Sequence, residues 1–308
     1  MISRKIVRTF REGKIMKKDR TRSYLMLIAS MTVFGTVGIF RRYIPLSSAM
    51  LAFSRGILGG LFLLLIVWVS HHKFERISRK CFLVLVLSGA LMGINWITLF
   101  EAYNYTTVAT ATMCYYMQPT IVLLLSPLVF REKLTAKKLV CAAVSVVGML
   151  FVSGMLEGNA VGSEDFKGVL YGLSSAVFYA AVVIISKKVP VEDAYAKTVI
   201  QLFSAAVVLI PYLLLTESAE TLQIGGTGLW MLLIVCIVHT GIAYAAYFSS
   251  VKTLKAQSVA VLSYIDPVCA LLLSALFLRE RLTLLGLLGA ALILASALVS
   301  ELGEKQSN

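Results

Sequence analysis

A long phrase that occurs twice constrains this chain more than any other feature. Residues 117–135 read MQPTIVLLLSPLVFREKLT, and residues 265–283 read IDPVCALLLSALFLRERLT. Matching residues recur 148 positions later, as Pro119 and Pro267 show. Because this offset is close to half of the 308 residues, the chain is predicted to contain two copies of one unit. An internal duplication in an apolar chain is typical of membrane transporters built from two half-repeats.

Charge is scarce over long blocks of the sequence. Only 15% of the residues are charged and 58% are hydrophobic, whereas about 25% of a soluble domain is charged. A helix needs about 20 apolar residues to cross the hydrocarbon core of a bilayer. An all-α membrane protein is therefore predicted, with ten transmembrane helices near residues 24–40, 47–70, 81–103, 107–130, 139–156, 168–185, 195–215, 228–251, 256–278 and 284–300.

The lysines and arginines between these stretches set the predicted orientation. Most of them fall in loops of one side, which the positive-inside rule places in the cytoplasm together with both termini. Five spans per copy is an odd number, so the second copy must insert upside down relative to the first. We therefore expect two five-helix inverted-topology repeats in the cell membrane, residues 23–156 and 167–300, with a basic cytoplasmic segment at 1–22 and a cytoplasmic tail at 301–308.

The first fifteen residues have two interpretations. Met16 precedes a basic stretch that leads directly into the first span, which makes it a natural start and residues 1–15 an untranslated extension. Alternatively, these residues form a basic amphipathic helix on the membrane surface, with Ile2, Ile6 and Phe10 on one stripe. No small-residue cleavage site of a signal peptide precedes the first apolar core.

Other functional classes lack the residues they require. The net charge of +13 lies in short loops and in the N-terminal segment, so no nucleic-acid partner is expected. The five cysteines have no metal-binding or redox spacing, and none of the GxSxG, Walker A, HExxH and CxxC motifs occurs. We expect no enzyme activity, no metal and no cofactor. Without a nucleotide-binding segment, transport would be secondary.

Two proline sites lie at membrane depth, where a charged side chain costs about 2.5–3.5 kcal/mol at the helix centre. Asp266 precedes Pro267 in the ninth span, and its counterpart Gln118 precedes Pro119 in the fourth. Proline removes a backbone donor, so a kink or hinge is expected at Pro119 and at Pro267. Asp266 either meets a substrate amine or carries a coupling proton, or it only bonds backbone exposed at the kink. Gln118 is the matching candidate.

Aromatic side chains accompany these sites. Tyr264 and Tyr116 are related by the repeat and stand two residues before Asp266 and Gln118. Away from the interface belts, aromatic rings are candidates to line a cavity for a small amphipathic solute, with core packing as the alternative. The further candidates of this kind are Trp96, Tyr115, Tyr179, Tyr244 and Tyr247.

Two more ionisable residues lie within the predicted spans. Arg55 occurs in the second span, and Glu101 near the outer end of the third is its predicted partner in a structural or gating pair. Alternatively, Arg55 faces an aqueous vestibule and attracts carboxylates. His239 in the eighth span is either a proton relay or a neutral imidazole bonded to a neighbouring carbonyl.

The two copies end in matching corners. Glu132 and Glu280 close the fourth and ninth spans, and Thr135 and Thr283 stand where the next helices begin. Threonine is a favoured N-cap residue, so these threonines are predicted to cap those helices. The corners are interpreted as structural.

At this point the sequence resembles a known family. Two five-span halves, each with a proline, twelve intervening residues, Glu-(Lys/Arg)-Leu-Thr and a final apolar helix, look like EamA-type members of the drug/metabolite transporter superfamily. The resemblance implies a ten-helix inverted-repeat fold in the inner membrane and export, less often uptake, of amino acids and related metabolites, driven by gradients or exchange. Arg55 in the second span matches a residue often present in the family. The positions of Pro119, Pro267, Glu132 and Glu280 also match the family's pattern.

The predicted function is secondary transport of a small metabolite, amino-acid-like or amphipathic, by alternating access. A lipid-linked or nucleotide-linked sugar carrier is the alternative, although it calls for a larger and more basic cavity and only Arg55 would serve it. The expected partners are the substrate and the lipid bilayer. Small residues such as Gly286 and Ala290 in the last helix pack within the protein or against a second copy, which leaves a homodimer open.

Overall fold

The computed structural model is helical throughout the residues that it describes, with no strand among them. The predictions for residues 1–20 and 302–308 and for Glu132 lie outside this description. The described residues are 21–131, 134–153, 156, 164–217, 224–251, 254, 256–280 and 283–301.

Seven helices of the described chain are long and apolar enough to cross a membrane. Shorter apolar helices occupy the other three predicted ranges: α8 (Ala136–Val152), α13 and α14 (Ala256–Ser263 and Ile265–Phe277), and α15 (Leu284–Glu301). Each predicted range therefore contains a helix. The seven long helices are Thr21–Arg41, Ser48–Val69, Arg79–Tyr105, Val108–Phe130, Glu164–Lys188, Ala194–Thr216 and Gly226–Ser250.

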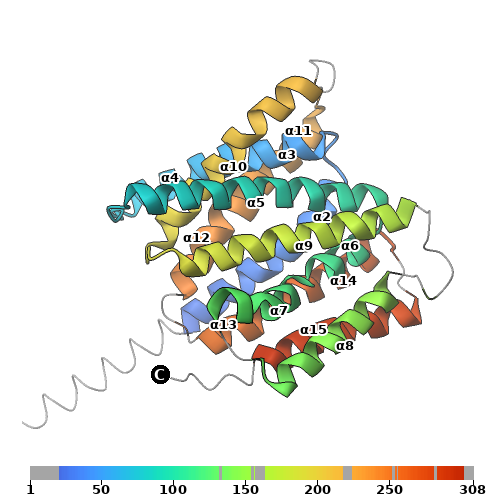
Figure 1. Cartoon of the computed structure of the whole chain (residues 1–308). Coiled ribbons are helices and arrows are strands. Elements are labelled where there is room, and N and C mark those ends of the chain that lie inside the picture. Colours follow the sequence, from blue (N-terminus) through green and yellow to red (C-terminus); the bar gives the residue numbers. More distant parts are fainter. Residues whose placement is uncertain are drawn as a thin grey trace, which may run out of the picture.

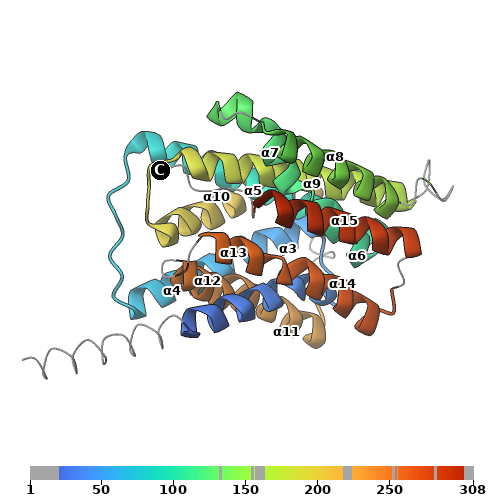
Figure 2. The same ribbon diagram turned by 90° about the horizontal axis from the view of Figure 1, so that it is seen from below.

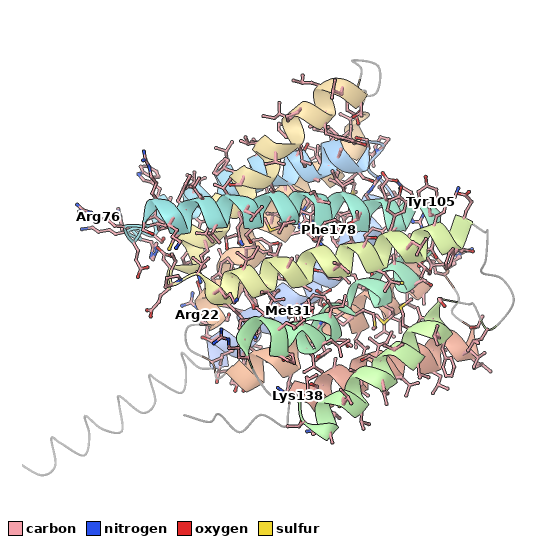
Figure 3. All side chains as sticks on the ribbon, viewed as in Figure 1. Arg22, Met31, Arg76, Tyr105, Lys138 and Phe178 are labelled. Atoms are coloured by element: carbon pink, nitrogen blue, oxygen red, sulfur yellow. The ribbon has the colours of Figure 1, made fainter. Side chains whose placement is uncertain are left out.

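Three long helices form the centre of the molecule. α5 (Arg79–Tyr105) packs between α9 (Glu164–Lys188) and α10 (Ala194–Thr216) (Figure 1). Figure 3 shows Arg76, just before α5, and Tyr105, at its end, on opposite sides of the molecule. The axis of α5 therefore gives the direction across the membrane, from the predicted inner end at Arg76 to the predicted outer end at Tyr105.

Two of the long helices contain a π-helical segment. The second is composed of α3 (Ser48–Ser54), η1 (Arg55–Gly59) and α4 (Gly60–Val69). The eighth is composed of α11 (Gly226–Ile234), η4 (Val235–Ile242) and α12 (Ala243–Val251). η1 and η4 pack against each other. Wide π-helical turns occur frequently at functional sites, and these two carry Arg55 and His239.

Both repeat-related helices are interrupted in the middle. α6 (Val108–Tyr115) is followed by α7 (Gln118–Phe130), and α13 is followed by α14. Pro119 and Pro267 stand in the first turn of the second piece, where a helix leaves its N–H groups unbonded and tolerates proline. The predicted interruptions are therefore present, while the role of these prolines as hinges stays a prediction.

The corner predictions also agree with the structure. The Thr135 hydroxyl accepts a hydrogen bond from the Lys138 N–H, and the Thr283 hydroxyl accepts one from the Gly286 N–H, so both threonines are N-caps. Arg131 and Arg279, which follow the ends of α7 and α14, both adopt left-handed backbone conformations with φ of 59° and 55°. The two copies thus end in the same local geometry.

The small residues of the last helix pack against another helix of the same chain. α15 lies along α8, and a β-carbon at Gly289 would come within 2.8 Å of the Phe151 β-carbon, so the two backbones approach closely. Ala290 is buried in a cluster with Met149 and Val152. This face therefore packs within the protein.

Candidate substrate cavity

A cavity of about 130 Å³ lies between the two halves of the chain. Residues of the first, second, third, fourth, sixth, eighth and ninth predicted spans contribute to its wall. They are Phe34, Gly35, Val37, Arg55, Trp96, Leu99, Tyr103, Thr112, Tyr115, Tyr116, Tyr179, His239, Tyr244, Asp266 and Ala270.

Arg55 is the cationic group of this cavity. Its guanidinium carbon lies 4.3 Å from the centre of the Trp96 ring, and its Nε donates to the Thr240 hydroxyl at 3.2 Å. The residue is only 6% exposed. Stacking on a tryptophan and one hydrogen bond hold the planar group in place without neutralising it. The Arg55 guanidinium is therefore positioned to pair with a carboxylate on a bound solute.

The predicted ion pair between Arg55 and Glu101 is wrong. Glu101 instead accepts a hydrogen bond from Asn104 on its own helix, at 3.2 Å. No carboxylate of the described residues forms an ion pair with Arg55. The reason is geometric, because Trp96 and Phe100 of α5 cover the guanidinium face instead.

Asp266 is the anionic group of the same cavity. It stands in the first turn of α14, at the helix interruption, and its carboxyl interacts with the Tyr116 hydroxyl. The first span comes close here, because a β-carbon at Gly35 would lie 2.5 Å from the Asp266 carbonyl oxygen. Only glycine allows this approach. The two helix interruptions thus bring a carboxyl and a phenol from the two repeats together.

Aromatic rings form most of the remaining wall. Tyr115 and Tyr179 stack with ring centres 5.3 Å apart, and Phe34 meets Tyr244 edge-on at 5.4 Å. Aromatic pairs of this kind stabilise each other by about 0.5–1.5 kcal/mol beyond the area they bury. The wall is therefore largely aromatic with a few polar groups, which suits a small amphipathic solute.

His239 contacts neighbours on both ring nitrogens. Nε2 lies 2.7 Å from the Thr36 hydroxyl, and Nδ1 lies 3.3 Å from the Ile234 carbonyl oxygen. The Thr36 hydroxyl also donates to the Val33 carbonyl at 2.7 Å, so its lone pairs face Nε2 as well. Both interpretations of His239, as a proton relay and as a neutral imidazole bonded to a carbonyl, stay predictions.

Not every sequence candidate contributes to the cavity. Asp266, Tyr116, Trp96, Tyr179, Tyr244, Arg55 and His239 line it, whereas Gln118, Tyr264 and Glu101 are not among its lining residues. Sequence reasoning missed Phe34, Tyr103 and Thr112. Tyr103 had a usable signal, because it stands seven residues after Trp96 and so shares its helix face.

A network on the predicted outer side joins the two halves. The Glu280 carboxylate accepts hydrogen bonds from the backbone N–H groups of Val108 and Ala109, at 3.0 and 3.3 Å, and pairs with Arg42 at 3.3 Å. The Arg42 guanidinium also donates to the Thr106 carbonyl at 3.1 Å. A carboxylate at a helix N-terminus is favoured by the helix dipole. We call this network the outer clamp.

A second hollow of about 610 Å³ lies beside the outer clamp. Arg42, Asn104, Asp165 and Glu280 bring charged and polar groups to its wall. Arg42, Thr106 and Glu280 of the outer clamp line this hollow, and none of them lines the central cavity.

Comparison with known proteins agrees with the repeat architecture. The profile of the EamA-like transporter family matches the chain twice, over residues 21–154 and 166–301. The chain belongs to the EamA-like transporter family. As such it is a multi-pass membrane protein of a transporter family.

Similar proteins carry transporter names. An uncharacterized transporter of Bacillus subtilis (strain 168), YxxF, is 27% identical over 92% of this chain and 91% of its own length. An uncharacterized transporter of Archaeoglobus fulgidus is 28% identical over 89% of this chain and 94% of its own. A crystal structure with 19% identity superposes with a TM-score of 0.62 over 93% of this EamA-like chain and 99% of its own, which shows the shared fold.

Proposed function

We propose that this EamA-like protein is a secondary transporter that moves a small amino-acid-like or amphipathic metabolite outward across the cell membrane. Both termini lie in the cytoplasm, and ten helices in two inverted repeats enclose the central cavity. The observation that carries the proposal is the presence of one cationic and one anionic side chain, Arg55 and Asp266, in a single aromatic cavity at the paired helix interruptions. A solute with a carboxylate and an amine complements both charges.

The packing of the broken helices supports alternating access. The outer pieces α6 and α14 lie side by side (Figures 1 and 2), whereas their repeat counterparts α13 and α7 have no comparable packing among the described residues. In a transporter with inverted repeats, the packing seen in one repeat in the inward-open state is adopted by the other repeat in the outward-open state. The outer clamp then holds a conformation that is closed on the outer side, and transport requires its release.

In this mechanism Asp266 has one of two roles. The carboxyl binds a substrate amine, or it takes up a proton when the substrate leaves. Either role couples the charge state of the cavity to its occupancy, because an unpaired charge at the bilayer centre is costly. Arg55 orients the substrate through its carboxylate.

The sugar-carrier alternative fits the cavity less well. Drug-sized ligands occupy pockets of about 300–1,000 Å³, and the central cavity has about 130 Å³ with Arg55 as its cationic group. A nucleotide or lipid diphosphate would require more space and more cations. Amino-acid-like substrates require neither.

Efflux from proteoliposomes tests the proposal. Vesicles loaded with a mixture of amino acids and small metabolites are sampled by mass spectrometry, with and without a pH gradient. We expect protein-dependent release of one or a few zwitterionic compounds. The Asp266→Asn variant should release them at least tenfold more slowly or lose the response to the gradient.

The matched control is Glu101→Gln, which removes a carboxylate that does not line the cavity. It should transport close to the wild-type rate. Wild-type behaviour of Asp266→Asn at every pH would remove Asp266 from the mechanism. Release of nothing from the zwitterionic pool by folded protein would reject the substrate class.

A further inference from the structure

A further cavity lies away from the central one, toward the predicted inner end of the helices. It has about 130 Å³ and opens between α7, α8 and α15, with Lys187 of α9 at its edge. We call it the inner cleft. Its wall includes Leu123, Ser126, Phe130, Lys138 and Ser145. Figure 3 shows Lys138 where α8 begins.

The Ser126 hydroxyl is the first sign that the inner cleft binds a ligand. Ser126 is 5% exposed, and its hydroxyl oxygen has no hydrogen-bond partner among the described residues. Its repeat counterpart Ser274 instead donates to the Leu271 carbonyl at 3.0 Å. A buried hydroxyl without a partner is unfavourable, so a group that accepts its proton would stabilise the site.

A proline adds a second polar group at the same place. Pro127 follows Ser126, whereas Ala275 follows Ser274 in the other copy. Proline has no N–H, so the Leu123 carbonyl loses the donor that the helix would otherwise supply. The first copy thus differs from the second where the inner cleft opens.

Two lysines give the inner cleft its charge. Lys138 and Lys187 both line it, and the Lys187 ammonium lies 5.8 Å from the centre of the Phe130 ring. The repeat counterpart of Lys138 is Gly286, so this charge also belongs to one copy only.

Apolar side chains continue from the inner cleft onto the lipid-facing surface of α7. Leu124, Leu125 and Leu128 are exposed, with Leu128 82% exposed. Val122 and Leu123 lie on the cleft side of the same helix. A ligand with an anionic head and a long apolar tail would match both surfaces.

We propose that the inner cleft binds the phosphate head group of an acidic phospholipid of the inner leaflet. Lys138 and Lys187 attract the phosphate, the Ser126 hydroxyl donates to one of its oxygens, and an acyl chain lies along the leucines of α7. Basic pockets between helices at the cytoplasmic side suit such head groups. The proposal rests on the predicted orientation and is independent of the transported substrate.

Native mass spectrometry of the purified full-length protein tests the proposal, with phosphatidylglycerol and phosphatidylcholine added in turn. We expect phosphatidylglycerol to bind at least fivefold more tightly than phosphatidylcholine. The double variant Lys138→Gln/Lys187→Gln should lose this preference. Lys73→Gln/Arg76→Gln removes two exposed charges from the same predicted face outside the cleft and should keep it.

A pair of serine variants distinguishes lipid binding in the inner cleft from attraction by general surface charge. Ser126→Ala removes the unpartnered hydroxyl and should weaken phosphatidylglycerol binding about threefold, with no loss of thermal stability. Ser274→Ala removes its bonded counterpart and should leave lipid binding unchanged.

Three results would overturn the proposal. One is equal binding of the two lipids, which would mark an adventitious contact. Another is full displacement of phosphatidylglycerol by inorganic phosphate at millimolar concentration, which would mark a site for free anions. The last is equal loss of binding in the Lys73→Gln/Arg76→Gln control.

Discussion

The Glu280 carboxylate and the Arg42 guanidinium come from opposite halves of the chain and meet at 3.3 Å on the predicted outer side. The same carboxylate accepts hydrogen bonds from the N-terminus of α6. One side chain therefore ties the last corner of the second repeat to two elements of the first. In the proposed mechanism, opening to the outside breaks these contacts.

The Glu280→Gln variant tests the outer clamp. Glutamine keeps one oxygen acceptor but loses the charge that favours both Arg42 and the helix N-terminus. We expect the population open to the outside to increase several-fold. Cysteine placed at Thr112, in a background without the native cysteines, should then react faster with a membrane-impermeant maleimide added outside.

Glu164→Gln is the control for this experiment. Glu164 is exposed and pairs with Lys167 of its own helix, so its loss leaves the contact between the halves unchanged. Equal labelling of Thr112→Cys with and without Glu280→Gln would mean that the outer clamp does not limit opening.

Replacement of Arg55 by lysine should separate charge from geometry. Lysine keeps the positive charge but cannot lie flat on the Trp96 ring or donate through Nε. A desolvated cation–π contact stabilises by about 2 kcal/mol, so we expect KM for a carboxylate-bearing substrate to rise about thirtyfold. Transport kinetics in proteoliposomes measure this, and exposed Arg76→Lys should match wild type.

Gly59 should tolerate no side chain, because its Cα packs directly against the side chain of Thr240. A β-carbon there would lie 2.5 Å from the Thr240 Cγ2, and Thr240 is the hydrogen-bond partner of Arg55. Gly59→Ala should cost about 1–3 kcal/mol of stability from overpacking and should slow transport as well.

Gly226→Ala is the matched control for Gly59→Ala. Among the described residues, nothing beyond its chain neighbours and its own helix backbone lies within 4 Å of a β-carbon at Gly226, at the start of α11. Alanine is the better helix former, so thermal unfolding in detergent should be unchanged or slightly raised. If Gly59→Ala behaves in the same way, the close approach of η1 to η4 is not required.

The loop before α10 should make stability depend on acid pH. Asp193 caps this helix through the Tyr195 and Ala196 N–H groups and accepts a bond from the His72 Nε2 at 2.9 Å. Burial alone would raise the pKa of the Asp193 carboxyl, but the bonds from His72 and from the Ala196 N–H leave it below the ordinary value of 3.8.

The sign of this effect follows from the lowered pKa. The folded form binds the Asp193 proton less readily than the unfolded form, so the stabilisation is complete above the ordinary pKa and is lost as the pH falls through the lowered one. Below about pH 4, the unfolding temperature of wild type should therefore decrease more steeply than that of Asp193→Ala. At neutral pH the variant should lose about 1 kcal/mol through the missing cap. Parallel pH curves would contradict this role.

Local features of the fold were predictable from the sequence because they depend on neighbours in the chain. The interruptions near Pro119 and Pro267 follow from the missing N–H of proline, and the caps at Thr135 and Thr283 follow from a hydroxyl placed before a helix. The apolar stretches similarly marked where helices lie. None of these features requires knowledge of a distant residue.

The partners across the molecule were not predictable in this way. Arg55 was expected to pair with Glu101, but it donates to Thr240, 185 residues away in the chain, and stacks on Trp96. Glu280 was interpreted as part of a corner, yet it also holds the N-terminus of α6. Periodicity places a side chain on a face of its own helix, but the rotation and height of the facing helix are set by packing.

The sequence by itself determined the duplicated architecture, the apolar helices, their interruptions and the set of polar residues at membrane depth, because repetition, hydropathy and backbone chemistry are written residue by residue. Tertiary structure alone decided which of those residues share the central cavity, which side of the molecule is clamped, and that Ser126 has no hydrogen-bond partner among the described residues and lies in one cleft with two lysines. The physical reason is that close approach depends on how whole helices pack, at contacts such as Gly35 against α14, and packing is a property of the assembled chain.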